Sequence, residues 1–141
     1  MSRVIHTESG TRTRSRLLQS IAVALGGLAA GGLSEHERRD RLAYTLLAFE
    51  SIARSVESTA DAWEKRGYWL KVDKFRAEWN WIRAPQTELR TAIQAEDWVR
   101  AEQSTASVLL RLASLPVPTQ RRRTKPWQDA YKRLQESETC G

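Results

Sequence analysis

The fold is decided by residues 34–66, which read SEHERRDRLAYTLLAFESIARSVESTADAWEKR. Ser34 and Glu37 have the spacing of a capping box, in which both side chains satisfy backbone amides of the first helical turn. Behind this start, apolar residues recur at alternating spacings of four and three from Leu42 to Trp63. Such spacing gathers them on one helical face, and further leucine and isoleucine residues broaden this face beyond a two-stranded coiled-coil seam. The stretch therefore predicts a helix about 50 Å long, at 1.5 Å per residue, within a multi-helix bundle.

A shorter helix is expected on the N-terminal side, over residues 17–33. This segment reads LLQSIAVALGGLAAGGL, and its leucine and isoleucine residues fall three and four positions apart, as on one face of a helix. Small residues on the other face, including Gly26 and Gly27, would let a neighbouring helix approach closely. Arginines before an apolar run also resemble a signal peptide or an organelle presequence. Gln19 and Ser20 interrupt that run, so the bundle helix is the favoured interpretation.

The long helix is expected to end at Gly67, and a third helix to run from Tyr68 to Arg83. The apolar residues of this third segment repeat the spacing of four and three. Ala84-Pro85 is expected to stop the helix, because a residue that precedes proline disfavours the helical region of backbone space.

Residues 86–115 are long enough for one helix, but two helices joined by a tight turn at Glu96-Asp97 are favoured. Asp97 is a good N-cap for the second of them. The run from Ala92 to Ala101, with its aspartate-tryptophan pair, resembles the hairpin of tetratricopeptide-type repeats. Because the run occurs once and no period of about 34 residues exists, it predicts a helical hairpin rather than membership of that family.

These expectations define an all-α fold, a compact bundle of four to five helices with one long central helix and a C-terminal helical hairpin. A length of 141 residues fits one domain. We expect a basic N-terminal arm over 1–16, the helical bundle over 17–116 and a basic C-terminal tail over 117–141, within which a short helix can form over 127–135. Both arms are expected to be flexible, because they are polar and highly charged.

The net charge of +6 is carried by the two ends of the chain. Residues 1–16 and 117–141 each carry a net charge of +3, whereas the middle holds equal numbers of acidic and basic residues. Basic arms on a neutral body suit contact with a polyanion such as RNA or DNA, although charged ends also occur as solvated tails. The phosphate-contact candidates are Arg12, Arg14, Arg16, Arg121, Arg122, Arg123 and Lys125.

Six tryptophans are the other unusual feature of the composition. Aromatic and basic residues interleave between Arg66 and Arg76. Trp69 and Trp81 lie off the apolar stripe of the third helix, so at least one of them should be partly exposed. An exposed indole rimmed by cations is typical of a protein-protein hot spot and also of a surface that stacks nucleic-acid bases. The partner-binding candidates are Trp69, Lys71, Lys74, Arg76 and Trp81.

No catalytic constellation stands out in the sequence. The carboxylates of the long helix, such as Asp40, are typical of a solvated face, and neither a glycine-rich phosphate loop nor a nucleophile motif is present. One cysteine, Cys140, and two histidines, His6 and His36, have no spacing typical of a disulfide framework or a zinc site. We therefore expect a protein that is not an enzyme, with no catalytic, cofactor-binding or metal-binding residues and no cofactor.

The sequence favours a non-catalytic helical interaction module, a small subunit or adaptor that docks on a protein partner or a second copy through its tryptophan-rich helix. The alternative is a nucleic-acid-binding protein that holds RNA or DNA phosphates with its two basic arms. No run of about 18 apolar residues predicts a membrane-spanning helix. We expect a cytoplasmic protein, with a cleaved N-terminal signal or presequence as the alternative.

Overall fold

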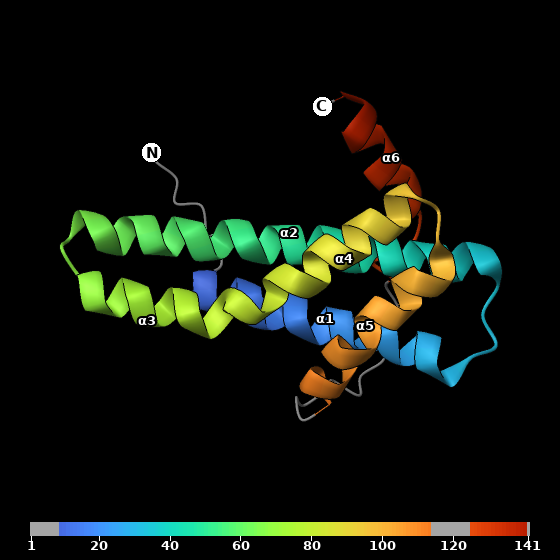
Figure 1. Cartoon of the computed structure of the whole chain (residues 1–141), viewed down its shortest axis with the longest axis horizontal. Coiled ribbons are helices and arrows are strands. Elements are labelled where there is room, and N and C mark those ends of the chain that lie inside the picture. The colour runs from blue at the N-terminus through green and yellow to red at the C-terminus, as the bar shows by residue number, and fades with distance from the viewer. Residues whose placement is uncertain (1–8, 114–124, 141) are drawn as a thin grey trace, which may run out of the picture.

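The chain folds as an all-α bundle, as the sequence predicts (Figure 1). The computed structural model describes residues 9–113 and 125–140, and no strand occurs within those two segments. The helices are α1 (Gly10–Ala30), α2 (Glu35–Lys65), α3 (Trp69–Trp79), α4 (Arg83–Gln94), α5 (Trp98–Leu112) and α6 (Ala130–Cys140), with a 3-10 turn η1 (Asn80–Ile82) between α3 and α4. None of these helices is both long and apolar enough to cross a membrane.

Helix α2 is the central element and runs the length of the molecule (Figure 1). Helix α1 packs antiparallel along α2 from its start to beyond its middle, where Arg14 reaches Thr59, and α3 turns back along its second half. The predicted apolar stripe forms much of the core, with Leu42, Leu46 and Phe49 fully buried. Ala53 and Trp63 from the same stripe are half-buried. The expectation of one long helix at the centre of a bundle is therefore confirmed.

The start of α2 forms only half of the predicted capping box. Ser34 Oγ accepts a hydrogen bond from the Glu37 amide at 3.1 Å. The Glu37 carboxylate instead accepts hydrogen bonds from Arg41 Nε and Nη2, at 3.2 and 2.8 Å, and these bonds lower the Glu37 pKa. Arg41 Nη1 donates in turn to the carbonyl oxygens of Val23 and Ala24, at 3.4 and 3.0 Å. Glu37 thus orients a buried arginine that joins α2 to α1.

Helix α1 begins at Gly10 rather than near Leu17, so the second half of the expected N-terminal arm belongs to the bundle. The arginine at position 14 explains the difference. Arg14 Nη1 donates to the Ser55 carbonyl and hydroxyl and to the Thr59 hydroxyl, at 3.3, 2.8 and 3.2 Å. These acceptors lie on α2, and nothing in the local sequence around Arg14 indicates them. Residues 1–8 lie outside the described part of the chain.

The expected helix from Tyr68 to Arg83 is divided, and the position assigned to its stop is wrong. Helix α3 ends at Trp79, and a new helix starts at Arg83. Pro85 lies in the first turn of this new helix instead of ending the old one. Amides of a first turn have no acceptor within the helix, so a proline ring is tolerated there.

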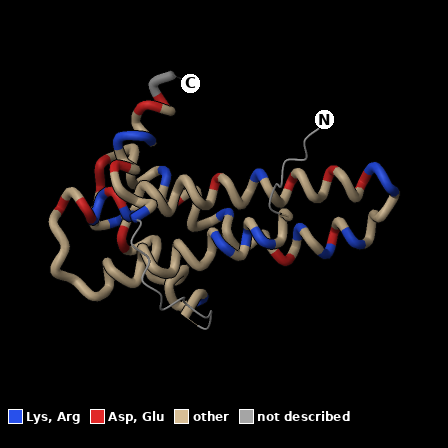
Figure 2. The backbone as a smooth tube through the Cα atoms, turned by 180° about the vertical axis from the view of Figure 1, so that it is seen from behind, with Lys and Arg blue, Asp and Glu red and all other residues tan. Residues whose placement is uncertain are grey.

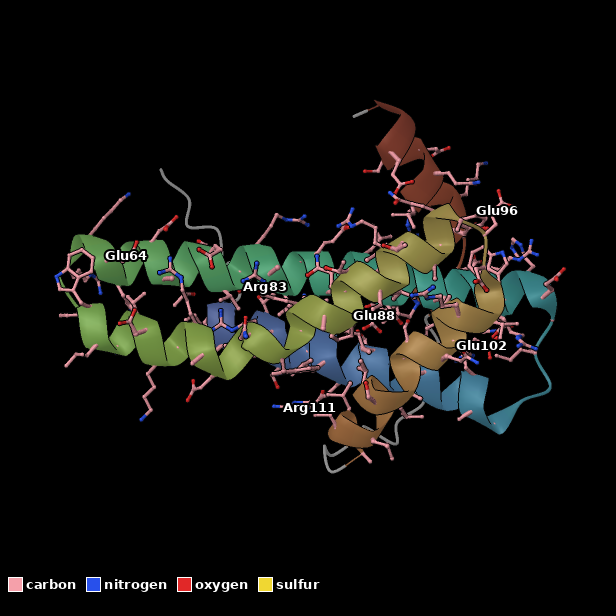
Figure 3. All side chains as sticks on the ribbon, in the orientation of Figure 1. Glu64, Arg83, Glu88, Glu96, Glu102 and Arg111 are labelled. Carbon is pink, nitrogen blue, oxygen red and sulfur yellow. The ribbon has the colours of Figure 1, made fainter. Side chains whose placement is uncertain are left out.

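The C-terminal hairpin is confirmed as two helices, α4 and α5, which pack against each other. Asp97 Oδ1 accepts a hydrogen bond from the Arg100 amide at 3.1 Å and so caps α5. Glu96 has a φ of 55°, the left-handed conformation that reverses the chain, and Figure 3 labels it at this turn. An acidic N-cap directly after a left-handed residue is why the chain turns here rather than continuing as one helix.

The described part of the C-terminal tail is a packed helix rather than a flexible arm. Helix α6 lies against α2, as Figure 1 shows near the C-terminus. Trp127, Ala130 and Leu134 are buried, which is the apolar face expected for a short helix over 127–135. The helix begins at Ala130 and continues to Cys140. Residues 114–124 and 141 lie outside the described residues.

Asp40 holds the start of α6 in place and is buried, contrary to the expectation of a solvated carboxylate. Its Oδ2 accepts a hydrogen bond from the Asp129 amide at 2.9 Å, and its Oδ1 accepts one from the Tyr131 amide at 3.1 Å. His36 Nε2 lies 3.3 Å from Oδ2. The first amides of a helix need acceptors from outside it, and a negative charge is favourable at that end. Asp40 supplies both to α6 from a neighbouring helix.

Asp40→Ala is expected to lower the free energy of unfolding by about 1–2 kcal/mol, because two amides lose a charged acceptor. Hydrogen exchange of the α6 amides should accelerate more than exchange in α1. The matched control is Asp61→Ala, which removes an exposed carboxylate from the same helix and should change stability by less than about 0.5 kcal/mol. Equal α6 exchange in the two variants would contradict the capping role of Asp40.

Candidate functional site

Three consecutive apolar side chains are exposed at the turn between α2 and α3. Tyr68, Trp69 and Leu70 are 46%, 62% and 86% exposed, and we call them the aromatic tip. In Figure 1 this turn forms one end of the molecule, far from α6. Side chains of this kind are usually removed from water, and a contiguous exposed group of them is typical of an interaction site.

The local sequence explains why the tip faces solvent. Gly67 takes a φ of 79°, and the amides of Gly67 and Tyr68 donate to carbonyl oxygens of the last turn of α2. This glycine-containing helix end reverses the chain within a few residues. Helix α3 then buries Val72 and Phe75, which share one helical face. Trp69 and Leu70 lie outside that face, and Tyr68 precedes the helix as its N-cap residue, so the three side chains of the tip remain exposed.

Basic side chains surround the tip. Lys71 Nζ lies 4.3 Å from the centre of the Trp63 ring and 5.8 Å from that of Tyr68, within the range of cation–π attraction. Lys65, Arg66 and Lys74 are exposed nearby, and Figure 2 shows basic residues on both sides of the α2–α3 turn. The arrangement offers apolar area for burial and positive charge around it, which suits an acidic, partly apolar surface.

The structure groups three of the five predicted partner-binding residues and separates the other two. Trp69, Lys71 and Lys74 lie on the first turns of α3. Arg76 instead pairs with two carboxylates of α2, and its hydrogen bonds with them raise its pKa. Trp81 lies beyond the other end of α3, half-buried, with the guanidinium of Arg111 4.5 Å from its ring centre. The expectation that one of the two off-stripe indoles is exposed is confirmed for Trp69.

Arg14 is not available for contact with phosphate, so this candidate is corrected. Arg14 is only 4% exposed. Its guanidinium lies 4.8 Å from the centre of the Phe75 ring and 5.5 Å from the centre of the Trp79 ring. Its hydrogen-bond acceptors are neutral oxygens of α2. Burial lowers its pKa, because desolvation disfavours the charged form.

The other phosphate-contact candidates are dispersed among the described residues. Arg12 and Arg16 are exposed on the first turns of α1, and Arg16 has an interaction within the chain. Lys125 is exposed where the second described segment starts. Arg121, Arg122 and Arg123 lie outside the described residues. The basic-arm hypothesis therefore stays a prediction.

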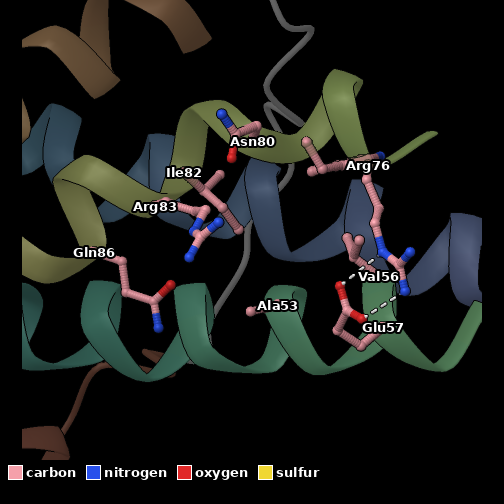
Figure 4. Close-up of a pocket in the computed structure, with 9 residues that line it drawn as sticks. Ala53, Val56, Glu57, Arg76, Asn80, Ile82, Arg83 and Gln86 are labelled. Atoms are coloured by element: carbon pink, nitrogen blue, oxygen red, sulfur yellow. Dashed lines mark hydrogen bonds and ion pairs between the residues drawn. The ribbon is translucent and has the colours of Figure 1, made fainter. Parts of the chain in front are cut away.

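A pocket of about 340 Å³ lies between α2 and the junction of α3 with α4 (Figure 4). Ala53, Val56 and Ile82 contribute apolar surface to it. Arg83 and Gln86 project into it from α4, as Figure 4 shows. Sequence reasoning missed this site, because its lining comes from separate helices whose crossing is a tertiary feature.

A third grouping joins residues that are distant in sequence. Ligand atoms of His36, Asp40 and Asp129 all lie within 4.8 Å of one another. Both oxygens of Asp40 accept backbone amides at the start of α6. The cluster is therefore explained by the contact between α2 and α6, in which Asp40 accepts these two hydrogen bonds.

The fold and the tip define the class of protein as an all-α bundle with an exposed aromatic-basic end. No protein-family model, no curated protein and no solved structure matches the chain.

Proposed function

We propose that the protein is a non-catalytic interaction module that docks on a protein partner through its aromatic tip, as a subunit or adaptor of a larger cytoplasmic assembly. The observation that carries the proposal is the run of three exposed apolar residues, Tyr68, Trp69 and Leu70, at a projecting turn. Tryptophan and tyrosine are enriched at the energetic centres of protein interfaces. Exposed Lys65, Arg66 and Lys74 around the tip favour a partner with acidic residues at the rim of its site.

Trp69→Ala is expected to weaken docking by about 30-fold or more, the effect of losing a hot-spot side chain worth about 2 kcal/mol. Stability should change by less than about 1 kcal/mol, because the indole is exposed. The partner would be identified by placing a photo-crosslinking residue at Leu70 in the cell of origin and measuring the affinity of the purified pair. Light scattering tests whether the partner is a second copy of the chain. In that case the wild type should be a dimer and the Trp69→Ala variant a monomer.

The matched control is Leu110→Ala, which truncates a side chain that is 78% exposed on α5, away from the tip. This variant should bind the partner as the wild type does. A crosslinked partner whose affinity falls less than about threefold on Trp69→Ala would contradict docking through the tip.

A nucleic acid is the second candidate partner. The exposed indole of Trp69, with Lys71 at the same turn and exposed Lys74 further along α3, also suits base stacking with phosphate contacts. Salt distinguishes the two candidates, because phosphate binding weakens steeply as salt rises, whereas burial of an apolar tip responds weakly. Titration of a fluorescent single-stranded oligonucleotide at two salt concentrations, with Trp69→Ala in parallel, tests this alternative.

A further inference from the structure

We propose that the pocket between α2 and the α3–α4 junction binds a small amphipathic carboxylate, whose anionic group pairs with Arg83 and whose apolar body lies on Ala53, Val56 and Ile82. This inference is independent of the aromatic tip, which lies at the far end of α3. A volume of about 340 Å³ is within the range of small-molecule sites.

The polar side chains at the two ends of the pocket differ in their hydrogen bonding. At one end of the pocket, Arg76 donates to the Glu57 carboxylate at 3.1 Å, so that pair is satisfied (Figure 4). At the other end, the Arg83 guanidinium has no hydrogen bond or ion pair with any residue in the described segments. Gln86, one turn further along α4, adds an amide on the same side. A guanidinium fork beside apolar surface fits a carboxylate in a bidentate geometry.

A buried positive charge lies behind one wall of the pocket. Trp79 lines the pocket, and the guanidinium of Arg14 lies 5.5 Å from the Trp79 ring centre. Arg14 is buried and has hydroxyl and carbonyl acceptors, with no carboxylate among its described partners. Among the charged side chains of the lining, Arg76 pairs with Glu57 and also with Glu64 outside the pocket, so Arg83 is the lining cation with no carboxylate partner in the described segments. Both contributions favour an anion over a neutral or cationic ligand.

Apolar surface lies between the two polar ends of the pocket. Ala53 and Val56 face the pocket from α2, and Ile82 faces it from η1. An inorganic anion would leave this surface in contact with water, whereas a ligand with an apolar body would cover it. The chemical class is therefore a carboxylate with an attached aromatic or branched aliphatic group.

The test uses 3-phenylpropionate and its uncharged counterpart 3-phenylpropanamide, titrated into ¹⁵N-labelled full-length protein. Both probes should shift the amides between Asn80 and Gln86, and the carboxylate should bind about tenfold more tightly. Arg83→Gln should remove that preference and leave the affinity for the amide unchanged. Arg66→Gln, an exposed arginine at the tip, is the matched control and should preserve the preference.

A second variant tests the apolar contact. Ala53→Leu fills the pocket from α2 and should weaken both probes to a similar extent, while circular dichroism confirms that the helices are retained. The proposal is overturned if the two probes bind equally to the wild type, if Arg83→Gln retains the preference, or if the shifts centre on the aromatic tip.

Discussion

Replacing Phe49 with alanine is expected to lower the free energy of unfolding by about 3–5 kcal/mol, the cost typical of truncating a buried aromatic residue. Phe49 lies near the middle of α2 and is fully buried. Its neighbours on the same face, Leu46 and Ile52, are also fully buried and are held by the same rigid helix. The site therefore has little freedom to collapse, and the variant loses both the transfer free energy of the ring and the packing around the cavity.

The measurement is equilibrium unfolding in urea, monitored by circular dichroism at constant protein concentration. Leu110→Ala serves as the control, because it removes an exposed apolar side chain and should change stability by less than about 0.5 kcal/mol. A loss below about 1 kcal/mol for Phe49→Ala would mean that this face of α2 is not the core of the protein.

Gly27→Ala is expected to destabilise the protein by about 1–3 kcal/mol, whereas Gly26→Ala should stabilise it by about 0.5–1 kcal/mol. Both glycines lie inside α1, where alanine is the better helix former. A Cβ at Gly26 meets nothing within 4 Å, but one at Gly27 would lie 2.6 Å from Cζ of Arg41. Arg41 cannot move aside cheaply, since its guanidinium bonds to α1 and Glu37 and lies 4.1 Å from the ring centre of Trp127.

The comparison of neighbouring glycines isolates the contact, because helix propensity predicts the same gain for both substitutions. Thermal unfolding of the two variants under identical conditions gives the sign directly. If both variants were more stable than the wild type, Arg41 would have an alternative position, and the close approach of its guanidinium to Gly27 would not be required for the α1–α2 contact.

The sequence was most informative where structure depends on near neighbours in the chain. The apolar spacing from Leu42 to Trp63 predicted α2 within about a residue at each end, because Ser34 and Gly67 supply local start and stop signals. The turn at Glu96-Asp97 was found for the same reason, since an N-cap acts within one helical turn. The exposure of Trp69 followed from the angle between successive residues of a helix.

Predictions from neighbouring residues were wrong where the folded structure gives a residue a different position or partner from the one that its local sequence suggests. Pro85 reads as a stop signal, yet it is accommodated in the first turn of α4. Glu37 has the spacing of a capping box, but the Arg41 side chain competes for its carboxylate. Arg14 lies in a segment with the composition of a solvated arm, but Ser55, Thr59 and two aromatic rings form a buried site for its side chain.

Local sequence patterns were sufficient to predict the helical class, the length and buried face of α2, the hairpin of α4 with α5 and the exposed indole at the tip. Each depends on periodicity or on a cap within a few residues. Only the packing of the helices lets Asp40 bond the amide of Asp129, 89 residues further along the chain, and sets Arg83 beside apolar side chains of α2 and η1. It also decided that Arg76 belongs to the α2–α3 contact rather than to the tip. Those outcomes depend on how helices cross, because a side chain then meets partners from distant segments whose positions no local pattern encodes.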